Sequence, residues 1–238
     1  MWPFTKYYSI LDSGFLEGAT DWHCHILPGV DDGIRTMESA LEVLDYYHEI
    51  GIREVWLTPH IMEDVPNKTG FLRERFAELQ AAYSGPIRLR LAAENMLDAL
   101  FEQRLAEGDL LTFSGKFLLV ETSYFNPPMD MDGIISKIKS AGLFPILAHP
   151  ERYMYMDERE YAGLKAQGVL FQLNLPSLVG AYGSTVRSKA EMILKKGWYD
   201  LSGTDLHRKS AFTHLLDESF PAKIAARLPS ASFFLSQL

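Results

Sequence analysis

The chain has little cysteine and no long apolar run. Its one cysteine, Cys24, excludes an intrachain disulfide, and nothing else in the composition indicates an oxidising compartment. No apolar stretch approaches the length that spans a membrane. Residues 1–18 lack the continuous apolar core of a signal peptide, because Asp12, Ser13 and Glu17 interrupt it. We therefore expect a cytoplasmic protein with no direct membrane insertion.

Positive charge is also scarce. The chain carries 23 lysines and arginines against 31 acidic residues, a formal net charge of −8. Proteins that bind nucleic acid over a broad face neutralise its phosphates with a basic stripe, and this sequence shows none. We therefore predict no nucleic-acid partner. The 238 residues, 47% of them hydrophobic, suffice for one sizeable domain.

Short apolar runs rich in β-branched and aromatic residues alternate with longer stretches of helical period, which is typical of repeated βα units. Helices are predicted from Met37 to a stop at Gly51, then over Phe71–Tyr83, Leu97–Ala106, Met131–Ala141, Arg159–Gln167 and Val186–Lys196. Gly142, Gly168 and Gly197 are expected to end three of them. We count about seven candidate strands, namely Thr20–His25, Glu54–Thr58, Ile87–Ala93, Phe117–Val120, Phe144–Ala148, Val169–Asn174 and Tyr199–Ser202.

The order of these elements predicts the architecture. Helices between consecutive strands imply parallel strands, and the lack of a Gly-rich nucleotide loop favours a closed or nearly closed barrel over an open sheet. The stretch from Phe212 to Leu228 is predicted to form closing helices interrupted by Pro221. No linker or low-complexity segment divides the chain, so we expect a single α/β domain.

Polar side chains gather where the predicted strands end. Parallel barrels place their sites at the C-terminal ends of the strands, so these positions are the candidates for chemistry. Five of the seven histidines lie there together with three acidic residues. The set is His23, His25, His60, Glu94, Glu121, His149, Asp205 and His207.

The spacing of these residues suits metal binding. His23 and His25 stand two residues apart on an extended chain, so both imidazoles point to one face, and Asp205 and His207 repeat that spacing. Taken alone, a histidine such as His60 is more often a packed or surface residue than a ligand. A lone glutamate at a strand end usually faces solvent or caps a helix. Convergence at nearly every strand end favours the metal hypothesis instead.

Imidazole and carboxylate ligands without thiolates suit zinc, manganese or iron. Eight candidate ligands are too many for one ion, so a cluster of two or three ions with bridging carboxylates is expected. Such clusters activate a water molecule and hold phosphate oxygens. Hydrolysis of a phosphate ester is therefore the leading reaction class, with amide or lactone hydrolysis as the rival.

Arg152 favours the phosphate ester. It follows the candidate ligand His149 by three residues, and its planar guanidinium group matches phosphate oxygens. The alternative is that Arg152 pairs with Glu151 or Asp157 at a helix start.

Two neighbouring carboxylates follow the first strand at Asp31 and Asp32, just before Gly33. For Asp31 we prefer a structural role in an Asp-Gly turn.

The candidate residues lie in seven short motifs, namely Asp21-Trp-His-Cys-His25, Pro28-Gly-Val-Asp-Asp-Gly33, Thr58-Pro-His60, Ala93-Glu94, Val120-Glu121-Thr122, Ala148-His-Pro-Glu-Arg152 and Ser202-Gly-Thr-Asp-Leu-His207. Together these motifs resemble the PHP (polymerase and histidinol phosphatase) superfamily, and within it the tyrosine-protein phosphatases of bacterial capsule and exopolysaccharide loci. The resemblance covers about residues 20 to 210.

The resemblance implies a distorted TIM-like (β/α)7 barrel with three divalent metal ions, usually manganese, with iron or zinc as alternatives. It implies that Asp32 and Arg152 act directly on the phosphate or leaving group. It also implies a phosphotyrosine protein as substrate, a bacterial tyrosine kinase that governs polysaccharide export. The metal ligands implied by motif are His23, His25, His60, Glu94, Glu121, His149, Asp205 and His207.

The sequence departs from the family pattern in two places. The first motif commonly stands at the N-terminus, whereas here residues 1–19 precede it, so we predict an N-terminal extension followed by one phosphatase domain over residues 20–238. Cys24 occupies a position where a small hydroxyl residue is common, and its side chain should point away from the metals. Two alternative functions stay open: a histidinol phosphatase or other small-molecule phosphomonoesterase, and a non-catalytic metal-bearing module.

Overall fold

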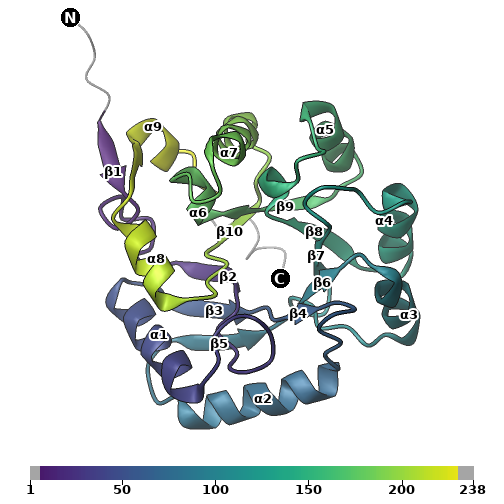
Figure 1. The fold of residues 1–238 in the computed structure, drawn as a ribbon, viewed down its shortest axis with the longest axis horizontal. Helices are drawn as coiled ribbons and strands as arrows, with labels where there is room; N and C mark the ends of the chain where they lie inside the picture. Colours follow the sequence, from purple (N-terminus) through teal and green to yellow (C-terminus); the bar gives the residue numbers. More distant parts are fainter. Residues whose placement is uncertain (1–5, 230–238) are drawn as a thin grey trace, which may run out of the picture.

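Parallel strands form a ring that helices surround in the computed structural model, which describes residues 6–229 (Figure 1). Each of the predicted strands is present, and two of them are interrupted. The strands are β2 (Thr20–Cys24), β3 (Glu54–Leu57) continued by β4 (His60–Ile61), β5 (Arg88–Leu91) continued by β6 (Glu94–Met96), β7 (Phe117–Glu121), β8 (Phe144–Ala148), β9 (Leu170–Asn174) and β10 (Leu201–Gly203).

The two interruptions lie side by side. Pro59, between β3 and β4, has no amide hydrogen and cannot donate to a ladder. Across the gap, Ala92 N donates to Leu57 O at 2.9 Å and Glu94 N donates to Pro59 O at 3.1 Å. The gap separates one parallel sheet of order β2-β3-β5 from another of order β10-β9-β8-β7-β6-β4.

The segment after β10 closes the ring against β2. The amide of Asp205 donates to His23 O at 2.7 Å, and the amide of His25 donates to Leu206 O at 3.0 Å. The ring of strands is therefore closed between β2 and the segment that follows β10. The prediction of a distorted TIM-like (β/α)7 barrel is confirmed.

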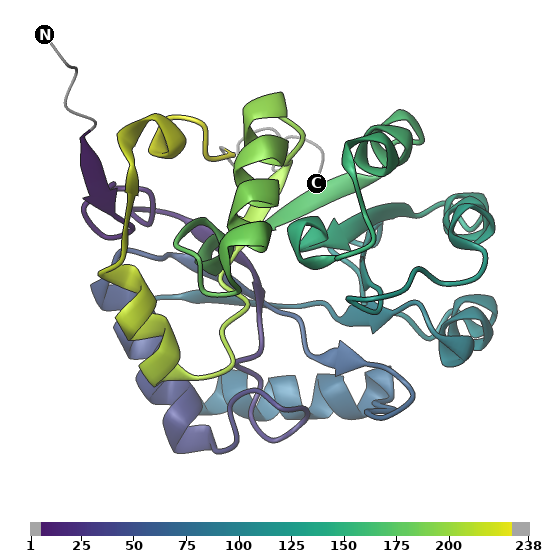
Figure 2. The same cartoon turned by 45° about the horizontal axis from the view of Figure 1, so that its top comes forward.

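Helices cover the outside of this barrel in both views (Figures 1 and 2). All six predicted helices are present, and positive φ angles at Gly51 (101°), Gly142 (79°), Gly168 (79°) and Gly197 (69°) confirm the predicted stops. The six are α1 (Met37–Glu49), α2 (Thr69–Ala82), α3 (Ala99–Glu107), α4 (Met131–Ser140), α5 (Glu158–Ala166) and α7 (Ser184–Lys196). The short helix α6 (Leu175–Leu178) and the 3₁₀ turn η1 (Pro150–Arg152) were not predicted.

Two apolar cores hold the layers together. The outer core lies between the strands and the helices, where α1 buries Ala40, Val43, Leu44 and Tyr47. The inner core fills the barrel, and its largest members are Trp22, Trp56 and Phe113. The Trp22 and Trp56 rings stack with centroids 6.0 Å apart. Their burial removes large apolar surfaces from water and leaves the strand ends for polar side chains.

The two ends of the described chain meet on one side of the barrel. Strand β1 (Tyr7–Ser9) pairs antiparallel with β11 (Ser219–Pro221), which the sequence did not predict, and α9 (Ala222–Ala225) follows. Helix α8 (Lys209–Leu216) lies beside α1 (Figure 2), where Phe212 contacts Tyr47 with ring centroids 5.5 Å apart.

The division of the chain into an N-terminal extension over residues 1–19 and a domain over residues 20–238 stays a prediction. Residues 1–5 of the extension and residues 230–238 of the domain lie outside the described part. Within the described part, the helices all fall short of the length and apolar character needed to cross a membrane.

Candidate metal centre

The eight predicted ligands meet at the C-terminal ends of the strands. Six of them are buried, while His60 and His207 are partly exposed. Donor atoms of seven of them, together with Asp32, form three overlapping groups: His23, His25, Glu94 and Asp205; His60, Glu94 and Glu121; and His25, Asp32, His60 and His207. His149 adjoins the second group, because its Nε2 lies 2.9 Å from Glu94 Oε1.

An irregularity in β2 turns His23, and His25 just after the strand, inward. The register with β3 shifts between Asp21 and Cys24. Asp21 faces helix α1 and accepts a hydrogen bond from the Tyr47 hydroxyl at 2.9 Å, whereas His23 and His25 approach each other with Nε2 atoms 3.2 Å apart. Cys24 Sγ instead lies 3.5 Å from Trp56 O, within the outer core. A bulge of this kind re-aims side chains beside a functional site.

The first group is wholly buried. His23 Nε2 lies 3.1 Å from Glu94 Oε2 and 3.5 Å from Asp205 Oδ1. His25 Nε2 lies 3.3 Å from each of the same two oxygens. Two imidazole nitrogens and two carboxylate oxygens thus converge on one point, which is the donor set that zinc, manganese and iron accept.

The second group contains two buried carboxylate oxygens whose nearest polar neighbours are imidazole nitrogens. Glu94 Oε2 and Glu121 Oε1 are fully buried and accept no well-aligned hydrogen bond from the described residues. His60 Nδ1 points at them from 3.1 Å and 3.0 Å. A buried carboxylate oxygen without a donor is costly unless a positive charge compensates it. The residues therefore fit a metal site.

The third group lies nearest to solvent. His207 Nε2 is 3.4 Å and His60 Nε2 is 3.7 Å from Asp32 Oδ1, and the Asp32 side chain is 75% exposed. Asp32, predicted to act on the substrate, thus also lies within ligand distance of this group. Glu94 belongs to two of the three groups, and a carboxylate can bridge two ions.

Two residues outside the predicted ligand set, Asp31 and Gln172, orient the imidazoles. Asp31 Oδ2 lies 2.8 Å from His25 Nδ1 and accepts the His60 amide at 3.0 Å. Gln172 Oε1 lies 2.8 Å from His23 Nδ1. These partners leave Nε2 of each imidazole facing the group, which is how carboxylates and amides orient metal-binding histidines.

The preferred interpretation of Asp31 as a turn residue was incomplete. Asp31 does accept the Gly33 amide at 2.9 Å in the turn, but its buried carboxylate also holds His25. The Asp-Asp-Gly sequence offered no sign of that second contact, because it depends on how the loop folds back onto the end of β2.

Opposite charges keep the cluster ionised. Burial by itself lowers the pKa of His23, but the carboxylates of Glu94 and Asp205 outweigh it and raise this pKa to about 9. Burial raises the pKa of Asp31, yet the charge of His25 and the hydrogen bonds at its oxygens lower it to about 2. Metal binding needs a neutral imidazole, so a cation must displace the proton of His23.

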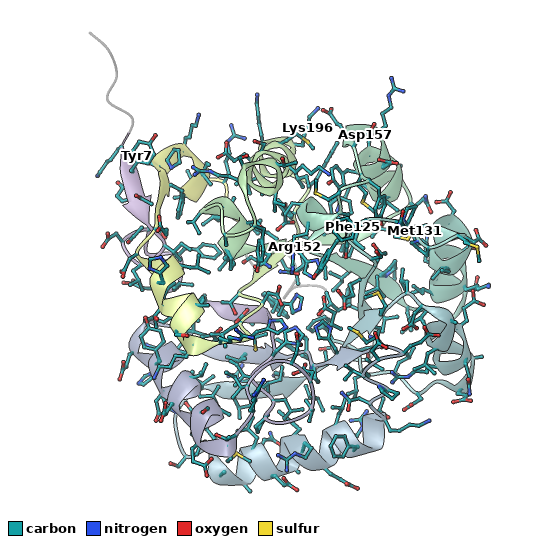
Figure 3. The ribbon with its side chains drawn as sticks, viewed as in Figure 1. Tyr7, Phe125, Met131, Arg152, Asp157 and Lys196 are labelled. Atoms are coloured by element: carbon teal, nitrogen blue, oxygen red, sulfur yellow. The ribbon has the colours of Figure 1, made fainter. Side chains whose placement is uncertain are left out.

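Arg152 borders the same group from the turn after β8. Its Nη1 donates to Asp205 Oδ2 at 2.8 Å, and Figure 3 places it towards the centre of the molecule, with Asp157 at the rim. Glu151 instead accepts the Asn174 amide at 3.0 Å and the Tyr199 hydroxyl at 2.9 Å. The alternative pairing of Arg152 with Glu151 or Asp157 was therefore wrong.

Two candidate ligands have a strained backbone. His149 has a φ of 33° and Asp205 a φ of 52°, values that residues other than glycine seldom adopt. Such conformations persist where the surrounding structure holds them, and they are frequent at functional sites.

A cavity of about 460 Å³ opens over the cluster. One part of its wall is polar, with Asp32, His60 and Arg152, and another part is apolar, with Pro176 and Leu215. A phosphate ester with an apolar leaving group matches these two parts in character.

The sequence matches the family described as "Capsular polysaccharide synthesis, CpsB/CapC" over residues 19–222. The match covers most of the chain, including the eight clustered residues. This chain belongs to the CpsB/CapC family.

Relatives and a solved structure agree with this membership. The chain is 26% identical over 194 residues to the tyrosine-protein phosphatase YwqE of Bacillus subtilis, which covers 79% of this chain and 76% of YwqE. It is 25% identical over 201 residues to the tyrosine-protein phosphatase CpsB of Streptococcus pneumoniae, covering 79% of this chain and 82% of CpsB. A crystal structure from work on these two metal-dependent tyrosine phosphatases matches with a TM-score of 0.75 at 23% identity, over 92% of this chain and 87% of the other. This chain therefore has the same fold as that crystal structure.

Proposed function

We propose that this CpsB/CapC chain is a metal-dependent protein-tyrosine phosphatase. The observation that carries the proposal is the buried cluster of imidazoles and carboxylates directly beside Arg152, in which two carboxylate oxygens accept no well-aligned hydrogen bond from the described residues. The names of YwqE and CpsB as tyrosine-protein phosphatases support the substrate class.

The cluster would hold three divalent ions, one at each donor group, with manganese first and iron or zinc as alternatives. Divalent cations held there supply a more acidic water molecule and neutralise charge on phosphate oxygens. Glu94 would be shared between two ions. The proposed ligands are His23, His25, His60, Glu94, Glu121, His149, Asp205 and His207.

The chain's own groups would position the phosphate and hold the charge that develops on it. Arg152 donates N–H groups from the cavity wall to the equatorial phosphate oxygens, where charge accumulates during transfer. Asp32, exposed at the cavity mouth, lies where it can orient a water molecule or the leaving oxygen. A tyrosine leaving group has a pKa of about 10, so its protonation matters less than the hold on the phosphoryl group.

The protein partner would be a bacterial tyrosine kinase of the polysaccharide export system, acting in the cytoplasm. The family description links CpsB/CapC proteins to capsular polysaccharide synthesis, which supports this choice.

The test is a comparison of substrates on the purified protein. After metal analysis, turnover is measured with a phosphotyrosyl peptide and with histidinol phosphate, before and after chelation and with manganese restored. We expect manganese-dependent hydrolysis of the peptide. Preference for histidinol phosphate would favour the small-molecule phosphatase, and metal binding without any hydrolysis would favour the non-catalytic module. Full activity after complete metal removal would contradict the proposal.

A further inference from the structure

Two tyrosine rings pack against the guanidinium group of Arg152. Its Cζ lies 4.4 Å from the ring centroid of Tyr124 and 4.3 Å from that of Tyr182. The Arg152 side chain is 17% exposed and Tyr182 is 38% exposed, so the guanidinium group is largely shielded from water while the Tyr182 ring keeps one part in contact with it. A cation over an aromatic face gains more when it is desolvated, which gives both rings an energetic role.

The two tyrosines come from different elements. Tyr124 follows β7 and also contacts His149, with ring centroids 5.9 Å apart. Tyr182 lies in the turn between α6 and α7, next to Gly183, whose φ is 91°. That backbone conformation suits glycine and lets the turn carry Tyr182 back over the strand ends.

Tyr182 belongs to a closed set of contacts among four residues, the others being Asn174, Arg152 and the candidate metal ligand Asp205. Asn174, at the end of β9, donates through Nδ2 to Tyr182 Oη at 3.2 Å and to Asp205 Oδ2 at 2.9 Å. The same Asp205 oxygen accepts Arg152 Nη1 at 2.8 Å. The guanidinium group is thus held by the Asp205 carboxylate and by two aromatic rings, while it still borders the cavity.

We propose that Tyr182 is a positioning residue for phosphate binding, because its ring keeps the Arg152 guanidinium group against Asp205 at the cavity wall. The inference rests on the proposed function in one respect, the assignment of phosphate to Arg152. Tyr182 is remote in sequence from every motif of the metal cluster, so the sequence analysis did not select it.

The competing role for Tyr182 is direct contact with the aromatic ring of the substrate, since it also lines the cavity. The two roles differ in what they predict for a ligand without a ring. If Tyr182 acts through Arg152, its loss weakens binding of every phosphate ligand by the same factor. If it stacks on the substrate, inorganic phosphate binding does not change.

The experiment uses the manganese-loaded protein and its Tyr182→Ala and Tyr182→Phe variants. Affinity for inorganic phosphate is measured by calorimetry, and kcat and KM are measured with a phosphotyrosyl peptide. We expect Tyr182→Ala to weaken phosphate binding about tenfold, within the roughly 2- to 30-fold effect of a cation–π contact. The peptide KM should rise by the same factor. Tyr182→Phe, which keeps the ring, should restore both values to within about threefold.

A double variant tests whether the effect passes through Arg152. In the Arg152→Ala background, Tyr182→Ala should weaken phosphate binding no further, because the contact has already been removed. Trp198→Ala is the matched control. Trp198 lies at the other end of α7 with its ring 5.6 Å from the Lys196 ammonium, and Figure 3 shows Lys196 at the rim, away from Arg152. This control should leave phosphate binding unchanged.

Three results would overturn the inference: unchanged phosphate affinity in Tyr182→Ala, a full additional loss in the double variant, or a comparable loss in Trp198→Ala. Manganese content and circular dichroism check that each variant is folded, and Tyr182→Leu replaces Tyr182→Ala if the alanine variant is not. Phosphate binding is measured without turnover. A chain that binds phosphate but hydrolyses no phosphotyrosine would contradict the proposed function and leave the role of Tyr182 decided separately.

Discussion

The Asp205 carboxylate joins Arg152 to the candidate metal centre. One oxygen, Oδ2, accepts a hydrogen bond from Arg152 Nη1 at 2.8 Å, while the other, Oδ1, lies 3.5 Å from His23 Nε2 and 3.3 Å from His25 Nε2. The same carboxylate therefore contacts the guanidinium group on one side and the two imidazoles that would hold an ion on the other. The residues proposed to bind phosphate and those proposed to bind metal can therefore be tested separately.

On the phosphate side, Arg152→Ala should lower kcat/KM for a phosphotyrosyl peptide by about 10²- to 10³-fold, as expected when a donor to developing charge is removed. Asp32→Asn should cost less, about tenfold, because a phenolate leaves with little help from an acid. Steady-state kinetics of both variants at matched manganese content checks the order. The reverse order would indicate an alkyl phosphate as the natural substrate.

On the metal side, Glu94→Gln should remove more bound manganese than Glu121→Gln. Glu94 belongs to two donor groups and Glu121 to one, so the first substitution weakens two sites. We expect at least about a tenfold loss of metal affinity for Glu94→Gln. Metal analysis after dialysis against a weak chelator measures it. Equal metal content in the two variants would contradict a shared Glu94.

Asp31→Asn should weaken metal binding by about 10- to 100-fold without removing any ligand, since it loosens the orientation of His25. Competition with a chelating dye measures this affinity. Asp64→Asn, which changes an exposed aspartate after β4, is the control and should bind metal normally. If Asp31→Asn also binds metal normally, the orienting role is wrong.

Metal binding should release protons and strengthen as pH rises, because His23, with its pKa raised to about 9, must lose a proton first. In the chelated protein, by contrast, a rise in pH lowers the folding stability. A raised histidine pKa contributes stability that is complete below its unfolded value of about 6.5 and is lost as pH rises through about 9. Denaturant unfolding from pH 6.5 to 9 should show the chelated protein losing stability and the manganese-loaded protein keeping it. Parallel trends in the two forms would contradict this.

Cys24→Ser should keep activity within about threefold, since the thiol is buried in the outer core and points to Trp56 O rather than to the metal cluster. The burial also raises the pKa of this thiol, which makes it a poor nucleophile. Turnover at equal metal content is the measurement. Loss of activity with the metal retained would indicate a cysteine nucleophile and contradict the proposed chemistry.

The sequence by itself indicated the barrel and the set of candidate ligands that meet at its strand ends. Short apolar runs in the strands and a 3.6-residue period in the helices are local signals, so strand ends such as those at Glu121 and His149 were predictable from short windows. Because parallel strands end on one side of a barrel, residues far apart in the chain were expected to meet there, and they do.

Only the tertiary structure decided which residues hold that cluster in place. The bulge in β2, the contact of Asp31 with His25 and the contact of Tyr182 with Arg152 depend on how loops return over the strand ends. The pairing of β1 with β11 likewise joins segments some 210 residues apart. Local propensity carries no information about such long-range contacts, since each is selected by packing and hydrogen bonding against surfaces that exist only in the folded barrel.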